Sequence, residues 1–281
     1  MKKTVCITFD VEPDFGGLLT NDVYFGKKDL PKLERIVNMY NLKLTAFVTG
    51  KTLEENPEII DLLENMKAEI AQHSYSHRIT QRNDSDHDSK IKDIQKGIEV
   101  HEKIVGTRPL GYRAPLGIIT QEEISFLDDI GIKYDSSVWP AFFPGRFNRL
   151  NFPVMPFAIS ESNLIEIPMA VIPKIRIPIA LGYMQLVGIR SFKLLFAMFG
   201  LPNLVVYGFH TYQLGKVASY NELSAIPKLG YYRAQRRSTN PAQVFEDFVK
   251  YILSKGYESK YMIDIYNDVK SKVPLWEWSG D

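Results

Sequence analysis

The sequence lacks three features that would narrow its class at once. It has one cysteine, Cys6, so no disulfide can form within the chain. Its 34 basic and 33 acidic side chains leave a net charge of +1, which provides no strong field toward nucleic acid or another polyanion. It has no uninterrupted apolar run of about 18 residues, the length that a transmembrane helix needs. These absences exclude three classes: a disulfide-stabilised domain, a protein that binds polyanions through a large positive net charge, and a helical membrane protein.

The composition is that of an ordinary globular protein, with 45% hydrophobic, 12% aromatic and 24% charged residues. The 281 residues fit one α/β barrel of roughly 250 residues, and we find no linker, so we expect a single domain over 1–281. The apolar run from Val5 to Phe9 is too short for a signal peptide and stops at Asp10. We therefore expect a cytoplasmic protein, with Cys6 as a small buried strand residue.

Short apolar runs alternate with helix-like stretches through the first half of the chain. Strands are predicted at Thr4 to Phe9, Leu44 to Val48, Ala68 to Ala71, Gly111 to Arg113 and Ile132 to Tyr134, and helices at Pro31 to Met39, Pro57 to Met66, Asp88 to Val105 and Thr120 to Ile130. Thr120 and Glu123 have the spacing of a helix capping box. This alternation predicts a parallel sheet, and its length favours a barrel or a broken barrel.

The pattern changes after Trp139, where prolines become frequent among Phe, Ile and Met. We interpret residues 140–200 as a Pro- and aromatic-rich insertion in the barrel. Further strands are predicted at Leu164 to Ile167, Leu204 to Phe209 and near Lys260 to Ile265, and helices at Phe192 to Phe199 and Pro241 to Ser254. The apolar helix at Phe192 leaves peripheral contact with a membrane open, against the alternative of core packing.

Polar residues follow several predicted strands, at the barrel end where functional residues gather. Asp10 and Glu12 end the first strand, and residues two apart on an extended chain point to the same side. His73 and His77 have the spacing that lets two imidazoles reach one ion. Two histidines and one carboxylate form a zinc-type ligand set with open positions, as catalytic zinc sites have. The competing interpretation is two ordinary loop histidines beside a solvated acidic turn.

Five segments, in this order, resemble the motifs of a known family. They are Thr8 to Glu12, His73 to His77, Arg113 to Pro115, Asp135 to Trp139, and His210. Order and spacing resemble those of the polysaccharide deacetylases with the NodB homology domain, carbohydrate esterase family 4, over about residues 4–265. The resemblance implies a distorted (β/α)7 barrel with one divalent metal, commonly zinc, that hydrolyses N-acetyl or O-acetyl groups on sugars.

The resemblance also implies the metal ligands. Most members carry the metal carboxylate directly after the first aspartate, where this chain has Val11. The chain resembles the Asp-Val-Asp/Glu subgroup, in which the second acid binds the metal. That makes Glu12, His73 and His77 the expected ligands.

The remaining motif residues receive roles by the same resemblance. Asp10 matches the general base and Arg113 the arginine that holds it. His210 matches the general acid, and Asp135 the carboxylate that tunes this histidine. Leu116 stands where a backbone N–H binds the oxyanion, and Trp139 resembles the aromatic wall of the substrate groove.

Two positions depart from the family pattern near the last motif. Gly208 stands where the family has an apolar residue that packs against the acetyl methyl group. Either Tyr207 or Phe209 takes this role, or the acetyl pocket is wider. Gln213 stands where the subgroup often has a carboxylate close to His210. His87 and His101, in polar or charged surroundings, are expected at the surface.

We therefore expect a metal-dependent hydrolase that removes N-acetyl or O-acetyl groups from a sugar or polysaccharide precursor, in cell-surface polysaccharide biosynthesis. Without a leader, the substrate is expected to be nucleotide-linked or lipid-carrier-linked. The basic aromatic run at Tyr231 to Arg237 is either a solvated helix face or a phosphate contact. Two alternatives stay open: hydrolysis of another C–N bond, in a cyclic amide or ureide, and a catalytically degenerate carbohydrate-binding protein. No nucleic acid partner is expected, and the oligomeric state is open.

Overall fold

Seven parallel strands form the centre of the molecule, in a computed structural model that describes residues 2–12, 25–77, 87–215 and 240–278. Their spatial order is β10-β1-β2-β3-β4-β5-β9. The strands are β1 (Thr4–Val11), β2 (Leu44–Val48), β3 (Glu69–Gln72), β4 (Gly111–Tyr112), β5 (Tyr134–Asp135), β9 (Ile165–Glu166) and β10 (Leu204–His210). This is the expected distorted (β/α)7 barrel.

Shorter strands extend the barrel at its edges. β8 (Phe157–Ile159) pairs antiparallel with β9, and β12 (Leu275–Trp276) pairs with β8. β11 (Glu258–Ser259) pairs with β1, and β6 (Phe142–Phe143) with β7 (Phe147–Asn148) forms a separate hairpin.

The extended chain after β9 fills the gap between β9 and β10. The N–H of Met169 donates to the carbonyl of Val138 at 2.9 Å, and the N–H of Ala170 donates to Val206 of β10 at 2.9 Å. The stretch that we predicted as an insertion therefore supplies one barrel strand and the segment that nearly closes the barrel.

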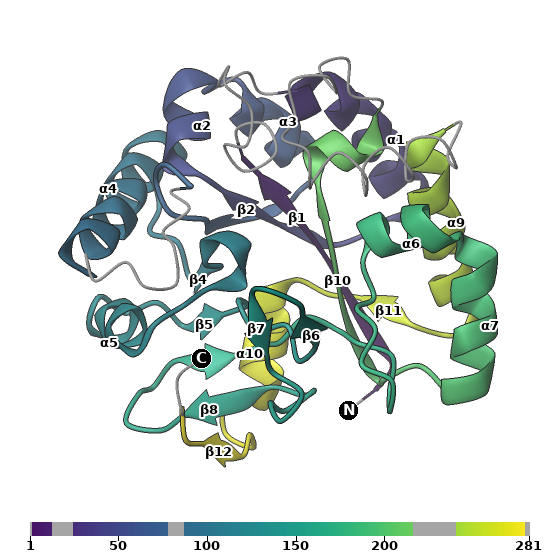
Figure 1. The fold of residues 1–281 in the computed structure, drawn as a ribbon. Helices are drawn as coiled ribbons and strands as arrows, with labels where there is room; N and C mark the ends of the chain where they lie inside the picture. The colour runs from purple at the N-terminus through teal and green to yellow at the C-terminus, as the bar shows by residue number, and fades with distance from the viewer. Residues whose placement is uncertain (1, 13–24, 78–86, 216–239, 279–281) are drawn as a thin grey trace.

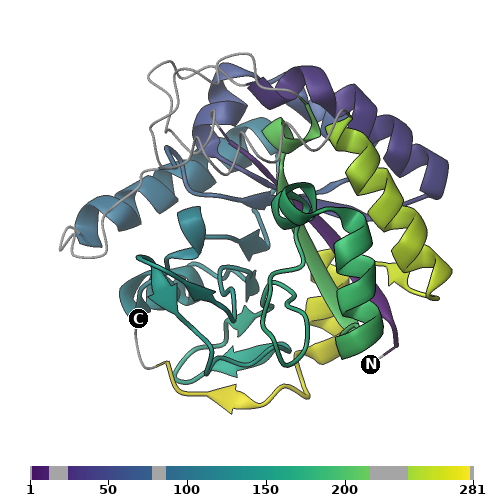
Figure 2. The same cartoon turned by 45° about the vertical axis from the view of Figure 1, so that its right-hand side comes forward.

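Helices surround the strands, as Figure 1 shows. They are α1 (Leu30–Tyr40), α2 (Gly50–Glu55), α3 (Ile59–Asn65), α4 (His87–Val105), α5 (Gln121–Asp129), α6 (Leu181–Val187), α7 (Ile189–Phe199), α9 (Pro241–Ser254) and α10 (Met262–Val269), with 3-10 turns η2 (Phe25–Asp29), η3 (Pro115–Gly117) and η4 (Thr211–Leu214). α7 lies beside α9 (Figure 2), and Phe196 stacks on Tyr251 at 5.8 Å. Within the described ranges, no helix is long and apolar enough to cross a bilayer.

Most predicted elements are confirmed, and one is wrong. The capping box of α5 is present, because Thr120 Oγ1 accepts the N–H of Glu123 and the Glu123 carboxylate accepts the N–H of Thr120. The strand predicted near Lys260 to Ile265 is instead the start of α10. Met262, Ile265 and Val269 are buried at helical spacing, and this pattern becomes clear only beyond the end of the predicted segment.

Candidate active site

β1 and the turn after β3 bring an acidic side chain and two histidines together. Nε2 of His77 lies 2.7 Å from Oε2 of Glu12, and Nε2 of His73 lies 3.3 Å from the same oxygen. One ligand atom from each residue lies within 4.8 Å of the others, and each side chain is almost fully buried. The three expected metal ligands therefore converge at the carboxyl end of the barrel strands.

The tautomer of His73 leaves one ring nitrogen with a lone pair that can bind an ion. Its Nδ1 lies 2.6 Å from the carbonyl oxygen of Arg113, which can only accept, so Nδ1 carries the proton. Nε2 is buried and has no hydrogen-bond partner among the described residues. A buried nitrogen lone pair beside a carboxylate and a second imidazole fits a divalent cation such as zinc.

The turn that carries the histidines is held by α4. Asp93 accepts the backbone N–H of Tyr75 at 3.1 Å, and both the N–H and the hydroxyl of Ser76, the latter at 2.6 Å. Ser74 and His77 have positive φ of 61° and 52°, a strained conformation for residues other than glycine. Asp93 was missed because it lies 16 positions after His77, with no local signal.

Asp10 forms a buried ion pair with Arg113. Nη1 of Arg113 lies 2.7 Å from Oδ1 of Asp10, while Nη2 donates to Thr8 Oγ1 at 3.0 Å. Burial favours a higher pKa for Asp10, but the charge of Arg113 opposes it, and this pKa lies below its ordinary value. The pair therefore keeps Asp10 ionised and fixed in direction.

His210 ends β10 and faces both acids. Its Nε2 lies 3.7 Å from Oδ2 of Asp10 and 3.6 Å from Oε1 of Glu12. Its side chain is 32% exposed, so it lies on the open side of the cluster. Gln213 accepts the backbone N–H of His210 at 3.1 Å, and Tyr212 stacks on the imidazole at 5.0 Å. The glutamine found in place of a carboxylate thus holds the backbone of His210.

Asp135 is placed away from its expected partner. It accepts the Ser137 hydroxyl at 2.7 Å and is paired with Glu166, and none of its described hydrogen bonds reaches His210. Burial raises the pKa of Glu166 well above its ordinary value, and burial also raises the pKa of the neighbouring Asp135. The hydroxyl of Ser137 in turn accepts the N–H of Ala114 at 2.7 Å. Asp135 therefore supports the chain that leads into η3.

η3 presents Leu116 with a φ of 57°, and Gly117 follows with a φ of 70°. A Cβ at Gly117 would lie 2.7 Å from the carbonyl of Ser137 and 3.0 Å from the indole of Trp139, so only glycine fits. Trp139 thus packs beside η3, and its role as the aromatic wall of the substrate groove stays a prediction. Arg149, fully buried, donates from Nη1 to the carbonyl of Gly117 at 2.7 Å. Arg149 was missed as a site residue because nothing near it in the sequence indicates burial.

The prediction that Tyr207 lines the site is wrong. Side chains alternate along β10, so Tyr207 points away from His210 and stacks on Phe248 of α9 at 4.1 Å, fully buried. The space beside Gly208 is filled by Met169, whose Cε would lie 2.2 Å from a Cβ at that position. Met169 also contacts the guanidinium of Arg113, with Sδ at 3.1 Å.

The other histidines fall in two groups. His101 is 1% exposed, so its predicted surface position is wrong: it lies on the inner face of the amphipathic helix α4. The side chain of His87 and the run Tyr231 to Arg237 lie outside the described residues.

Comparison with known proteins supports the resemblance in sequence. Residues 1–134 match the polysaccharide deacetylase family. The resemblance to the polysaccharide deacetylases is confirmed. A peptidoglycan deacetylase-like protein from Gibberella zeae is 32% identical over 118 residues, which cover 41% of this chain and 34% of that protein. The chain spans 34% to 55% of the length of the curated relatives it matches.

Solved structures support the polysaccharide deacetylase fold over the whole chain. A candidate polysaccharide deacetylase from Mycobacterium smegmatis superposes with a TM-score of 0.67 at 20% identity, covering 100% of this chain and 96% of that one. Puue allantoinase superposes with a TM-score of 0.64 at 13% identity, covering 97% and 92%. At these identities the likeness shows the fold alone. Membership of the Asp-Val-Asp/Glu subgroup stays a prediction.

Proposed function

We propose that this protein is a metal-dependent hydrolase that removes N-acetyl or O-acetyl groups from a sugar. The observation that carries the proposal is the convergence of Glu12, His73 and His77 next to the Asp10–Arg113 pair. A divalent ion held by the three ligands would polarise the acyl carbonyl and lower the pKa of a bound water toward about 7.

The chain's own residues would supply the proton transfers. Asp10, kept ionised by Arg113, takes a proton from the attacking water. The N–H of Leu116 donates to the acyl oxygen as negative charge develops there. His210, protonated, donates to the leaving nitrogen, because an amide anion is too poor a leaving group to depart without a proton. Its open side lets this histidine reach the sugar.

The substrate we propose is an N-acetylated sugar on a lipid carrier, used in cell-surface polysaccharide biosynthesis. Leu194 and Met198 on α7 are 62% and 64% exposed, beside Arg190 and Lys193, and no acidic residue occurs from 167 to 221. An apolar face with basic neighbours is typical of helices that lie on anionic lipid.

Sedimentation with phosphatidylglycerol vesicles tests this contact. We expect binding that the pair L194S and M198S abolishes and that M39S, which changes an exposed methionine on α1, leaves intact. Equal sedimentation of all three proteins contradicts it. A cytoplasmic location stays a prediction, which cell fractionation tests.

The central experiment combines metal analysis with acetate release from a panel of free and carrier-linked N-acetyl sugars. Asp10→Asn keeps the shape of the side chain but removes the base, so we expect bound metal with turnover at least about 100-fold lower. His73→Ala should lose both metal and turnover. His101→Phe changes a buried histidine outside the cluster and serves as the matched control, with metal and turnover retained.

The outcomes distinguish three hypotheses for the site: deacetylation, hydrolysis of another C–N bond, and sugar binding without catalysis. Metal with acetate release supports deacetylation, whereas full acetate release by Asp10→Asn shows that the base is assigned wrongly. Metal without acetate, but with opening of a cyclic amide or ureide, supports the second reaction. Sugar binding without bound metal and without turnover supports a catalytically degenerate carbohydrate-binding protein.

A further inference from the structure

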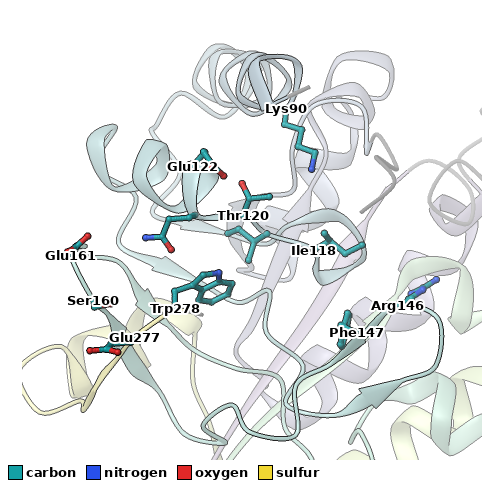
Figure 3. Close-up of a pocket in the computed structure, with 12 residues that line it drawn as sticks. Lys90, Ile118, Thr120, Glu122, Arg146, Phe147, Ser160, Glu161, Glu277 and Trp278 are labelled. Carbon is teal, nitrogen blue, oxygen red and sulfur yellow. The ribbon is translucent and has the colours of Figure 1, made fainter. Parts of the chain in front are cut away.

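A hollow of about 700 Å³ lies outside the metal cluster (Figure 3). Its walls come from the start of α4, the start of α5, the β6–β7 hairpin, the turn between β8 and β9, and the chain after β12. None of the three metal ligands lines it. Its volume is in the range of small-molecule sites, about 300 to 1,000 Å³. We call it the Trp278 pocket.

Trp278 gives the pocket an aromatic wall. Its ring meets Phe152 edge-on at 5.4 Å and is half-buried, so part of the indole stays accessible. The neighbouring strand is fixed, because the N–H of Ser160 donates to the carbonyl of Trp276 at 2.9 Å. An indole held in this way offers an apolar surface to the C–H face of a sugar and a negative face to a cation.

Charge is distributed unevenly around the indole. Glu122, Glu161 and Glu277 lie on the side of Trp278, whereas Lys90 and Arg146 lie across the pocket (Figure 3). With three carboxylates and two cations, the lining has a net charge of −1. The three carboxylates lie on the side of the aromatic ring (Figure 3). A ligand with apolar C–H groups and an ammonium group matches this side of the pocket.

We propose that the Trp278 pocket binds amino sugar units that carry a free, protonated amino group. Such units are what the proposed deacetylation produces, and the link to catalysis rests on that proposed function. Ile118 lines the pocket two residues after Leu116, so their Cα atoms lie at most about 7 Å apart. A sugar chain that passes over η3 would then place an already deacetylated unit at Trp278 and an acetylated unit at the metal cluster.

The test is calorimetric titration of metal-loaded Asp10→Asn protein, which cannot turn its ligand over, with glucosamine oligomers and with N-acetylglucosamine oligomers. We expect tighter binding of the glucosamine oligomers, weakened by salt. Trp278→Ala should weaken this binding about tenfold, from lost stacking and cation contact. Glu277→Gln should weaken it about threefold and reduce its salt dependence. Glu258→Gln, an exposed acid on β11, is the matched control and should change nothing.

Each outcome bears on the pocket separately from the deacetylase. Equal affinity for both oligomers, or glucosamine affinity unchanged by Trp278→Ala, overturns the proposal even if wild-type protein releases acetate. Selective binding that depends on Trp278 and Glu277 supports it even if no acetate is released, and the deacetylase proposal then fails alone. With both in place, partly deacetylated oligomers should be better substrates than fully acetylated ones, and Trp278→Ala should remove this advantage.

Discussion

The first five barrel strands and the stretch from 140 to 200 build the same site in different ways. In the first region, the side chains proposed to bind the metal or take part in proton transfer lie at strand ends: Asp10 on β1, His73 after β3 and Arg113 after β4. In the second region, the contributing side chains are buried behind the site. Arg149 holds the carbonyl of Gly117, and Met169 fills the space beside Gly208.

The difference lies in what determines the direction of each side chain. Strand alternation decides where Asp10 and Glu12 point, and this requires only a few neighbouring residues. The strands of the second region are only two or three residues long, so the directions of its side chains depend on contacts between segments, as where Glu166 accepts the N–H of Val138 at 2.9 Å. The first region therefore supplies reacting groups, and the second determines how rigidly they are held.

Arg149 offers the largest test of this division. Replacing it with methionine leaves the carbonyl of Gly117 without its donor and removes the guanidinium from Phe147, 4.4 Å away. We expect a loss of about 2 to 4 kcal/mol in the free energy of unfolding, measured in urea. Because η3 carries Leu116, we also expect kcat for acetate release to fall about tenfold or more, with KM little changed.

The control is Arg108→Met, which removes an exposed arginine paired with Glu102 at 3.1 Å. Surface pairs contribute at most about 1 kcal/mol, so this variant should resemble wild type. If Arg149→Met unfolds at the wild-type urea concentration with unchanged kcat, the second region does not support the site.

Much of the fold follows from sequence periodicity, and the irregular part does not. β2 begins and ends as predicted, and α4 differs by one residue, because apolar alternation and helical spacing are local properties. The hairpin β6–β7 and strand β8 were missed, since two or three residues carry no recognisable period. Their positions depend on packing against the rest of the barrel.

The site shows the same limit. Glu12, His73 and His77 could be named from motif spacing, whereas Asp93 could not, because its contact with the histidine turn exists only after folding. Asp135 was identified, but its hydrogen-bond partner Glu166 was not, because the two residues lie on different strands and meet only after folding. Tyr207 was misplaced although strand alternation from His210 already puts it on the opposite face.

His101 provides the smaller test. It is a buried polar residue on α4, the helix that joins β3 to β4 in the first region, and it belongs to no motif. Burial lowers its pKa to about 4, from an ordinary value of 6.5. Below pH 6.5, His101 is protonated in the unfolded chain but stays neutral in the folded protein. The free energy of unfolding therefore falls as the pH falls toward 4. Between pH 6.5 and 5 this costs about 2 kcal/mol.

Urea unfolding of wild type and His101→Phe at pH 7 and at pH 5 measures this difference. Both proteins share every other titrating group, so wild type should lose about 2 kcal/mol more than the variant on acidification. An equal loss in the two proteins would show that His101 is protonated in the folded state. A positive result sharpens the comparison: in the first region, a buried polar side chain without a role in the site weakens the fold in acid, whereas Arg149 in the second region stabilises it.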